Sequence, residues 1–240
     1  MPKQETDQST LNETEMMSLF DSRASMYGLL AGLYREELEF DRLQELKRMR
    51  FPVGTGNESI DQGFRDLHEY LKTAWEGSVT ELKVDFSRTF IGSGVSGYSA
   101  AYPYESVYTS ERRLLAREAR GEVLQYYRNN NLKKGRWNDL EDHIALELEF
   151  MQIMSARTRD AIENGDEDGT LNLIRCQYDF IRSHVNNWLP MMTGDVLKFS
   201  ETKFYRGVAM IALGYCEDDE ALLAELLDGA PEPAVEVSVA

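Results

Sequence analysis

Two short segments of this chain hold side chains that could bind a ligand or do chemistry. One is an aromatic turn, residues 102–108, with the sequence YPYESVY, and the other is residues 138–151, NDLEDHIALELEFM. Together they place phenols, carboxylates and one imidazole beside an apolar segment. Tyrosine rings next to acids offer contact area, hydrogen bonds and a partner for cations. The combination favours binding of a peptide over catalysis of a reaction.

A metal site is the first alternative, because His143 and Glu147 are four residues apart and share one face of a helix. A dinuclear carboxylate bundle needs Glu-x-x-His pairs on two helices. The other histidines, His68 and His184, do not lie in a second pair of this kind. We therefore expect no metal at His143.

Two other catalytic patterns are weak. Gly92, Gly94 and Gly97 match the dinucleotide fingerprint, which needs a strand before it and a helix directly after it. Here the preceding residues favour a helix and the following residues favour an extended turn, so we expect a mobile loop. Neither Ser106 nor Cys176 has a base at a recognisable spacing. We expect no catalytic residues.

The composition is that of an ordinary soluble protein, with a formal net charge of −16 over 240 residues. Such a surface repels nucleic acid and anionic lipid and attracts cationic partners. The two isolated cysteines, Cys176 and Cys216, are expected to be reduced. Because no signal peptide and no apolar run of about 20 residues is visible, we predict a cytoplasmic protein.

Apolar residues recur at helical spacing along almost the whole chain, and no convincing strand pattern occurs. The sequence therefore predicts an all-α single domain of about nine or ten helices over residues 13–229. Residues 1–12 and 230–240 are expected to be disordered tails. Apolar stripes mark helices at Phe20–Tyr34 and Leu43–Leu46, one capped by Asn57 that runs through Trp75, one that starts at Ser78 or Thr80, one over roughly Thr109–Asn130, one from Asn138, one from Thr170 that stops at Pro190, and two last helices at Phe204–Tyr215 and Leu222–Leu227.

The most apolar of these helices is predicted to begin at a capping box formed by Asn138 and Glu141. This helix has apolar residues on several sides, which is typical of a central helix. The same start would leave His143 exposed on the first turn, where it could contact a peptide. On this basis we expect that His143→Ala leaves stability nearly unchanged and weakens peptide binding about tenfold.

Four ordered motifs make the chain resemble a known family. They are the segment from Phe86 to Phe90 with its glycine loop, the turn PYESVY from Pro103, the helix opening EDHIALELEFM from Glu141, and Phe180-x-x-x-His184-x-x-x-Trp188-Leu189-Pro190. In order and spacing, they are similar to the TorD/DmsD family of redox-enzyme maturation chaperones. The likeness covers roughly residues 20–215.

The resemblance implies a TorD-like, all-helical, cytoplasmic chaperone that is not an enzyme. Such a protein binds the twin-arginine signal peptide and the apo-form of a molybdenum- or tungsten-cofactor oxidoreductase, and assists cofactor insertion before export. No resident cofactor is implied, with weak binding of a guanine nucleotide or of the molybdenum cofactor as the alternative. No nucleic-acid partner or membrane insertion is implied, and a homodimer is the alternative to a monomer.

The candidate peptide-binding residues come from both arguments. The resemblance places the family's binding positions on Phe90, Pro103, Tyr104, Ser106, Asp142 and His143. The chemistry of a twin-arginine segment calls for carboxylates and aromatic faces, which adds Glu105, Tyr108 and Glu147. One departure is that Glu105 stands where some relatives have a glycine.

Two other functions stay open at this stage. One is a metal-dependent helical enzyme that uses His143 and Glu147, which a metal analysis of the purified protein would detect. The other is a general acidic helical adaptor without any link to export. A neighbouring gene for a molybdoenzyme with a twin-arginine leader would argue against the adaptor.

Overall fold

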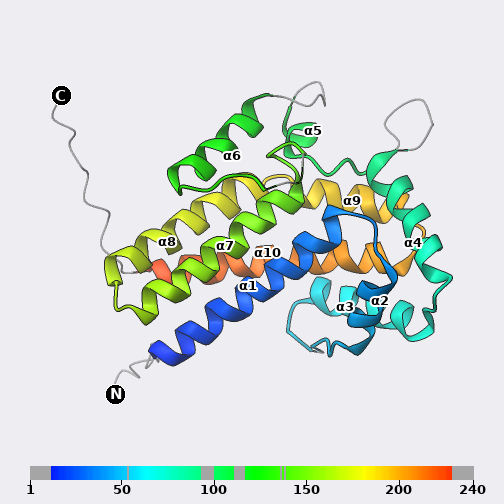
Figure 1. Cartoon of the computed structure of the whole chain (residues 1–240), viewed down its shortest axis with the longest axis horizontal. Helices are drawn as coiled ribbons and strands as arrows, with labels where there is room; N and C mark the ends of the chain where they lie inside the picture. The colour runs from blue at the N-terminus through cyan, green and yellow to red at the C-terminus, as the bar shows by residue number, and fades with distance from the viewer. Residues whose placement is uncertain are drawn as a thin grey trace, which may run out of the picture.

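The computed structural model describes residues 12–52, 54–92, 100–110, 117–135, 137 and 139–228. Over these ranges the chain forms ten α-helices and two π-helical segments, and no strand (Figure 1). The elements are α1 Glu13–Arg35, α2 Phe40–Arg48, α3 Glu58–Thr73, α4 Ser78–Phe86, η1 Ser87–Ile91, α5 Glu105–Thr109, α6 Arg117–Asn129, α7 Ile144–Glu163, α8 Glu167–Phe180, η2 Ile181–Val185, α9 Leu189–Phe199 and α10 Lys203–Leu227. The predicted all-α fold is confirmed.

Helices α1 and α7 form the central pair of the fold (Figure 1). Arg35 near the end of α1 pairs with Glu149 near the start of α7 at 2.8 Å, whereas Arg159 near the end of α7 lies 3.8 Å from Asp21. The two helices are therefore antiparallel. Nearly every residue in the first two turns of α7 is buried. The predicted central role of this helix is confirmed.

Helices α3 and α10 form the second close pair, and two glycines set their separation. A Cβ atom added to Gly63 would lie 2.7 Å from the carbonyl oxygen of Gly207, and one added to Gly207 would lie 2.6 Å from that of Gly63. Side chains at these positions would push the helices apart. This contact holds α2, α3 and α4 at one end of the molecule, at the right of Figure 1.

A buried carboxylate joins α4 to the start of α10. Asp85 accepts hydrogen bonds from the hydroxyls of Ser200 (2.8 Å) and Thr202 (2.6 Å) and from the backbone N–H groups of Glu201 and Thr202, each at 2.9 Å. Because the first N–H groups of a helix lack partners within the helix, an acid placed there stabilises the turn. Every carboxylate oxygen of Asp85 has a partner.

Several predicted helix limits are wrong. Of the helix predicted from Thr109 to Asn130, the described residues form α6, whereas Thr109 is the last residue of α5, which the aromatic turn itself forms. Asp166, rather than Thr170, caps α8 by accepting from the N–H of Gly169. Trp75, which was placed on the apolar stripe of α3, follows the end of that helix and is 69% exposed.

Two differences from the prediction lie in the C-terminal half: an additional helix, α9, and the joining of two predicted helices into one. Pro190 marks the start of a helix as well as the end of one, because it lies in the first turn of α9. At that position a backbone N–H would have no partner within the helix, so proline removes no helical hydrogen bond. The two final predicted helices are one continuous helix, α10. The acidic stretch between their apolar stripes stays helical because Asp218 accepts from Asn57, Asp219 pairs with Arg23, and Glu220 accepts from Asn186.

The predicted tails, the glycine loop at residues 93–99 and the proposed cap residue Asn138 lie outside the described residues, apart from Asn12, which caps α1. In the described part of the chain, no helix combines the length and apolar character that a membrane span requires.

Candidate functional site

The two segments that could bind a ligand lie against each other. Tyr104 and His143 form an isolated antiparallel bridge. The N–H of Glu105 donates to the carbonyl of Asp142, and the N–H of Ile144 donates to the carbonyl of Pro103, both at 2.9 Å. The aromatic turn is thereby fixed to the residues just before α7, and α5 and α7 start from the same point.

His143 ends this junction as the N-cap of α7. Its Nδ1 accepts a hydrogen bond from the N–H of Ala145 at 3.0 Å, and its ring meets the rings of Tyr104 (5.0 Å) and Trp137 (4.8 Å) edge-on. The side chain is only 4% exposed, and burial lowers its pKa to about 4. The prediction of an exposed histidine within the first helical turn is wrong, because α7 begins six residues after Asn138.

The tyrosines form the accessible side of the junction. Tyr104 is half-buried, and its hydroxyl donates to Asp139 at 2.8 Å. Tyr108 is also half-buried, stacks on Trp188 with 5.5 Å between ring centroids, and bonds Asp195 at 3.3 Å. Burial and the Asp139 carboxylate raise the pKa of Tyr104, so its hydroxyl keeps its proton. These two rings are more accessible than His143 and the buried acids near them.

Beneath the tyrosines lies a carboxylate cluster made of Glu105, Asp142 and Glu147, all of them buried. Glu105 contacts Nδ1 of His184 at 3.0 Å and accepts from the Asn187 amide at 3.1 Å. One oxygen of Asp142 accepts from the N–H of Ser106 at 3.2 Å, and one oxygen of Glu147 accepts from the indole of Trp188 at 3.1 Å. The cluster therefore joins α5, α7 and the η2 region.

The carboxylate cluster has more acceptors than donors. Asp142 Oδ1, Glu147 Oε1 and the hydroxyl of Ser106 have no hydrogen-bond partner. No lysine or arginine of the described residues makes an ion pair with these three acids. Burial raises the pKa of Asp142, and burial followed by the charges of Glu105 and Asp142 raises that of Glu147 well above its ordinary range. Glu147 therefore holds its proton at pH values where an exposed glutamate has lost it.

Phe90 is the one predicted site residue that lies apart. It belongs to η1 and packs its ring against Tyr34, Phe86 and Tyr205 at 5.1–5.7 Å. It is buried, and none of its described ring contacts involves the aromatic turn. Its position supports the core near the turn, because the Ala101 N–H donates to the carbonyl of Thr89 in the same segment.

Sequence reasoning did not include His184, Asn187 and Trp188 among the site residues. The four-residue spacing of His184 and Trp188 could have indicated them, because it places both on one helix face. The π-helical segment η2 ends at Val185, so Asn187 and Trp188 follow in a non-helical turn. Segments of this kind often occur at functional sites.

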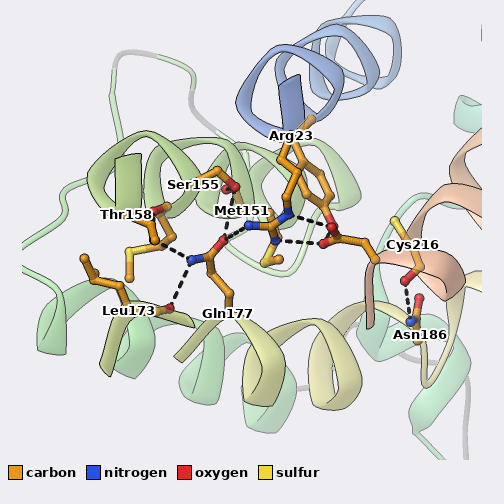
Figure 2. A network of polar contacts seen from close by, with 11 residues as sticks. Arg23, Met151, Ser155, Thr158, Leu173, Gln177, Asn186 and Cys216 are labelled. Carbon is orange, nitrogen blue, oxygen red and sulfur yellow. Dashed lines mark hydrogen bonds and ion pairs between the residues drawn. The ribbon is translucent and has the colours of Figure 1, made fainter. Parts of the chain in front are cut away.

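A second buried polar group is the arginine network, made of Arg23, Tyr27, Thr158, Gln177 and Asp219 (Figure 2). None of the buried side-chain atoms of these five residues lacks a hydrogen-bond partner. Arg23 donates to both oxygens of Asp219 at 2.6 and 2.8 Å and to Gln177 at 2.8 Å. Tyr27 donates to Asp219 at 2.5 Å, and the Gln177 amide donates to Thr158 at 2.8 Å. This network ties α1, α7, α8 and α10 together.

Two of the cavities lined by described residues are large enough for a ligand and charged or apolar in a way that favours one, and neither includes a residue of the carboxylate cluster. The larger, about 710 Å³, is lined mostly by apolar residues of α1, α3, α10 and the α2–α3 loop, together with Arg23 and Asp219, and contains none of the predicted site residues. The smaller, about 440 Å³, lies between α6 and the following loop and is lined by Arg128, Lys133, Lys134 and Glu141 among others. No group of metal-ligating side chains occurs in the described part of the chain.

Comparison with known proteins shows what this chain is similar to. A family model described as "Nitrate reductase delta subunit" matches residues 57–194, a span that includes both the aromatic turn and the start of α7. A protein named "Chaperone protein TorD" from Vibrio cholerae serotype O1 is 28% identical over 221 residues, covering 89% of this chain and 97% of the relative. The protein of the same name from Vibrio parahaemolyticus is also 28% identical, covering 87% and 98%. That from Shewanella piezotolerans is 22% identical, covering 82% and 90%.

Proposed function

Since this chain belongs to the nitrate reductase delta subunit family, we propose that it is a maturation chaperone for a molybdenum- or tungsten-cofactor oxidoreductase. In this role it binds the twin-arginine signal peptide of its client and assists cofactor insertion before export. The same proposal places it in the cytoplasm, where the client folds. Its relatives along almost their full length are named as chaperone proteins, which supports a non-enzymatic role.

The observation that carries the proposal is the carboxylate cluster beneath the aromatic turn. A twin-arginine leader brings two guanidinium groups followed by an apolar stretch. Its receptor needs carboxylates with free acceptor oxygens and aromatic surface nearby. Asp142 and Glu147 each have an unpartnered oxygen, and the half-buried rings of Tyr104 and Tyr108 lie above them.

Because the acids are buried, the leader peptide binds in two steps under this proposal. The leader first meets Tyr104 and Tyr108, whose rings are accessible. An arginine then reaches Glu105, Asp142 and Glu147, which are closed off in the present state. Pro103, Ser106 and His143 form the backbone frame of this entrance, and Phe90 supports it from the core.

The test is a calorimetric titration with the leader peptide of a molybdoenzyme encoded next to this chain. We expect Asp142→Asn to weaken binding about tenfold, which is about 1.4 kcal/mol. Glu141→Gln is the matched control, because this neighbouring acid already pairs with Arg120 and Lys134 and lies outside the cluster. Equal losses in the two variants, or wild-type affinity in both, would remove the assignment of the site.

A second binding function is favoured by the 440 Å³ cavity. Arg128, Lys133 and Lys134 line it together with one acid, Glu141, although the protein as a whole is strongly acidic. We propose that this cavity is where a guanine nucleotide or the phosphate-bearing molybdenum cofactor would bind weakly. Titration of guanosine triphosphate into wild-type protein and into Lys133→Glu tests this, and equal affinity in the two proteins would contradict it.

A further inference from the structure

The carboxylate cluster has an unusual charge balance for a protein interior. Three acids from α5, the loop before α7 and α7 itself converge, and two of them have an oxygen without a partner. Two negative charges close together in a buried site are unfavourable unless a cation or a proton compensates them. Burial and the charges of Glu105 and Asp142 raise the pKa of Glu147, so the site favours a proton on this acid.

We propose that this cluster exchanges a proton for the guanidinium of the leader arginine, so that binding of the peptide releases one proton from Glu147 to solvent. The inference rests on the proposed function and adds its regulation by pH. In the exchange, the O–H bond of the Glu147 carboxylic acid breaks and its proton leaves to the buffer. One positive charge replaces another, so the net charge of the buried site does not change.

The geometry favours arginine over lysine in this exchange. A guanidinium presents five donors in a planar fork, whereas a proton satisfies a single acceptor. The unpartnered oxygens of Asp142 and Glu147 and the hydroxyl of Ser106 are three groups that such a fork could reach. A lysine ammonium lacks the planar fork and would match these groups less well.

Entry of the arginine requires only a local rearrangement. Helix α5, which carries Glu105 and Ser106, has five residues. It is held to the start of α7 by the bridge bonds of Pro103 and Glu105 and by the bond from Ser106 to Asp142, and Glu105 also contacts His184 and Asn187. Displacing a helix of this length breaks these contacts and leaves the core helices in place.

The other charged groups near the cluster do not account for the same proton. His143 is neutral near pH 7 because burial lowers its pKa to about 4. Glu141 is paired with Arg120 and Lys134, and burial is opposed there by these cations, so its pKa is lowered.

Other titratable groups near the cluster or its tyrosines are His184 of η2, Asp195 of α9, Asp139 of the loop before α7, Tyr127 of α6 and Cys216 of α10. Burial raises the pKa of both Tyr127 and Cys216, so neither gives up a proton near pH 7. Of these groups, His184 contacts a cluster acid, Glu105.

The experiment is a titration of the leader peptide at pH 7 in phosphate and in Tris, whose ionisation enthalpies differ strongly. The apparent enthalpy plotted against the buffer's ionisation enthalpy gives the number of protons released. We expect about one proton per peptide for the wild type, and affinity that rises up to tenfold per pH unit. For Glu147→Gln we expect no proton release and an affinity independent of pH.

The outcomes separate this inference from the proposed function. Tight binding without proton release in the wild type overturns the exchange and leaves the chaperone function standing. Proton release that persists in Glu147→Gln assigns the proton to another group, such as His184, and also overturns it. Absence of any leader binding removes the proposed function, and the exchange with it. If Glu147→Gln fails to fold, the number of protons that the wild type releases on binding the leader tests the exchange by itself.

Discussion

The arginine network and the carboxylate cluster are both buried polar groups on α7, and they differ in how their charges are matched. In the arginine network, the fork of Arg23 meets both oxygens of Asp219, and every buried side-chain atom has a partner. In the carboxylate cluster, Glu105 alone contacts a histidine side chain, and oxygens of Asp142 and Glu147 lack partners. The same helix therefore supports one matched and one mismatched site.

The difference shows how a structural group can be told from a binding group. Buried polar atoms in folded proteins nearly always have partners, and leaving one without a partner costs about 1–3 kcal/mol. A fold that keeps two such oxygens close together sacrifices stability there. That loss is explained if a ligand supplies the missing donors, whereas the arginine network needs nothing from outside.

The largest expected effect comes from breaking the matched site. Arg23→Met should lower the free energy of unfolding by about 3–5 kcal/mol, because it leaves Asp219 buried without its cation. Urea unfolding measures this loss. The affinity of the folded variant for the leader should stay within about twofold of wild type. A stability loss below about 1 kcal/mol would show that the network does not hold the helices together.

The paired replacement Arg23→Met with Asp219→Leu is the control for that prediction. Removing both charges avoids the isolated buried carboxylate, so much of the lost stability should return. Tyr27 would lose its acceptor in this variant, so the recovery should be partial.

The next effect concerns the acid side of the stability profile. The pKa of His143 is about 4 in the folded protein and 6.5 in its ordinary state, so the folded state binds fewer protons between these values. Its contribution to stability is therefore full above pH 6.5 and is lost as pH falls to about 4. The shift corresponds to roughly 3 kcal/mol. The loss should be absent in His143→Gln, as measured by urea unfolding at pH 7 and pH 4.5.

This prediction concerns how the free energy of unfolding of each protein changes with pH, and not the absolute stabilities of wild type and variant. Replacing His143 also removes the cap on the Ala145 N–H, which lowers stability at every pH. The pKa values of Glu147 and Asp142 are raised in the folded state, so acidification increases stability through these two acids. This effect is present in both proteins and cancels in the comparison. Parallel profiles would mean that His143 is not held neutral by burial.

A smaller effect is expected as pH rises above the ordinary pKa of a glutamate, where the mismatched site should weaken the fold. The pKa of Glu147 is raised in the folded state, so its contribution is full below the ordinary value and is lost as pH rises. The slope is at most about 1.4 kcal/mol per pH unit for one proton. Glu147→Gln should lack this slope and should gain on wild type as pH rises above the ordinary value of 4.5, as measured by urea unfolding at a series of pH values. Parallel profiles of the two proteins would contradict the assignment.

The contrast also explains how much the sequence could reveal. Helical periodicity was enough for the all-α fold and for the central position of α7, because apolar residues at residues 144–151 need burial whatever surrounds them. The link between the aromatic turn and α7 could be suspected only from the types of side chain. Nothing local to Asp142 or Glu147 indicates that they are buried, since an acid in a sequence usually means an exposed side chain.

His143 shows the same limit in one residue. Its position after a polar stretch suggested an exposed helix start, and the prediction that His143→Ala would leave stability unchanged followed from that. In the structure, Trp137 and Tyr104 cover the ring, and burial rather than position decides its role. Both covering residues belong to segments that only the tertiary fold brings together. The structure therefore predicts a loss of stability for His143→Ala.

The smallest expected effect is that of salt on leader binding. It distinguishes attraction by the surface charge from pairing inside the carboxylate cluster. The formal net charge of −16 should attract the cationic leader over a distance, and salt screens such forces beyond roughly 8–10 Å at ~0.1–0.15 M. We therefore expect the association rate to fall as salt rises, with a change in affinity below about tenfold. The dissociation rate should be nearly constant, because the arginine is paired inside the protein, where ions do not reach it. Stopped-flow kinetics with a labelled leader measures both rates, and a leader with both arginines changed to glutamine should lose most of the salt dependence. A dissociation rate that rises with salt as steeply as the association rate falls would place the arginines on the surface near Tyr104 and Asp139, and the carboxylate cluster would then lose its role as their receptor.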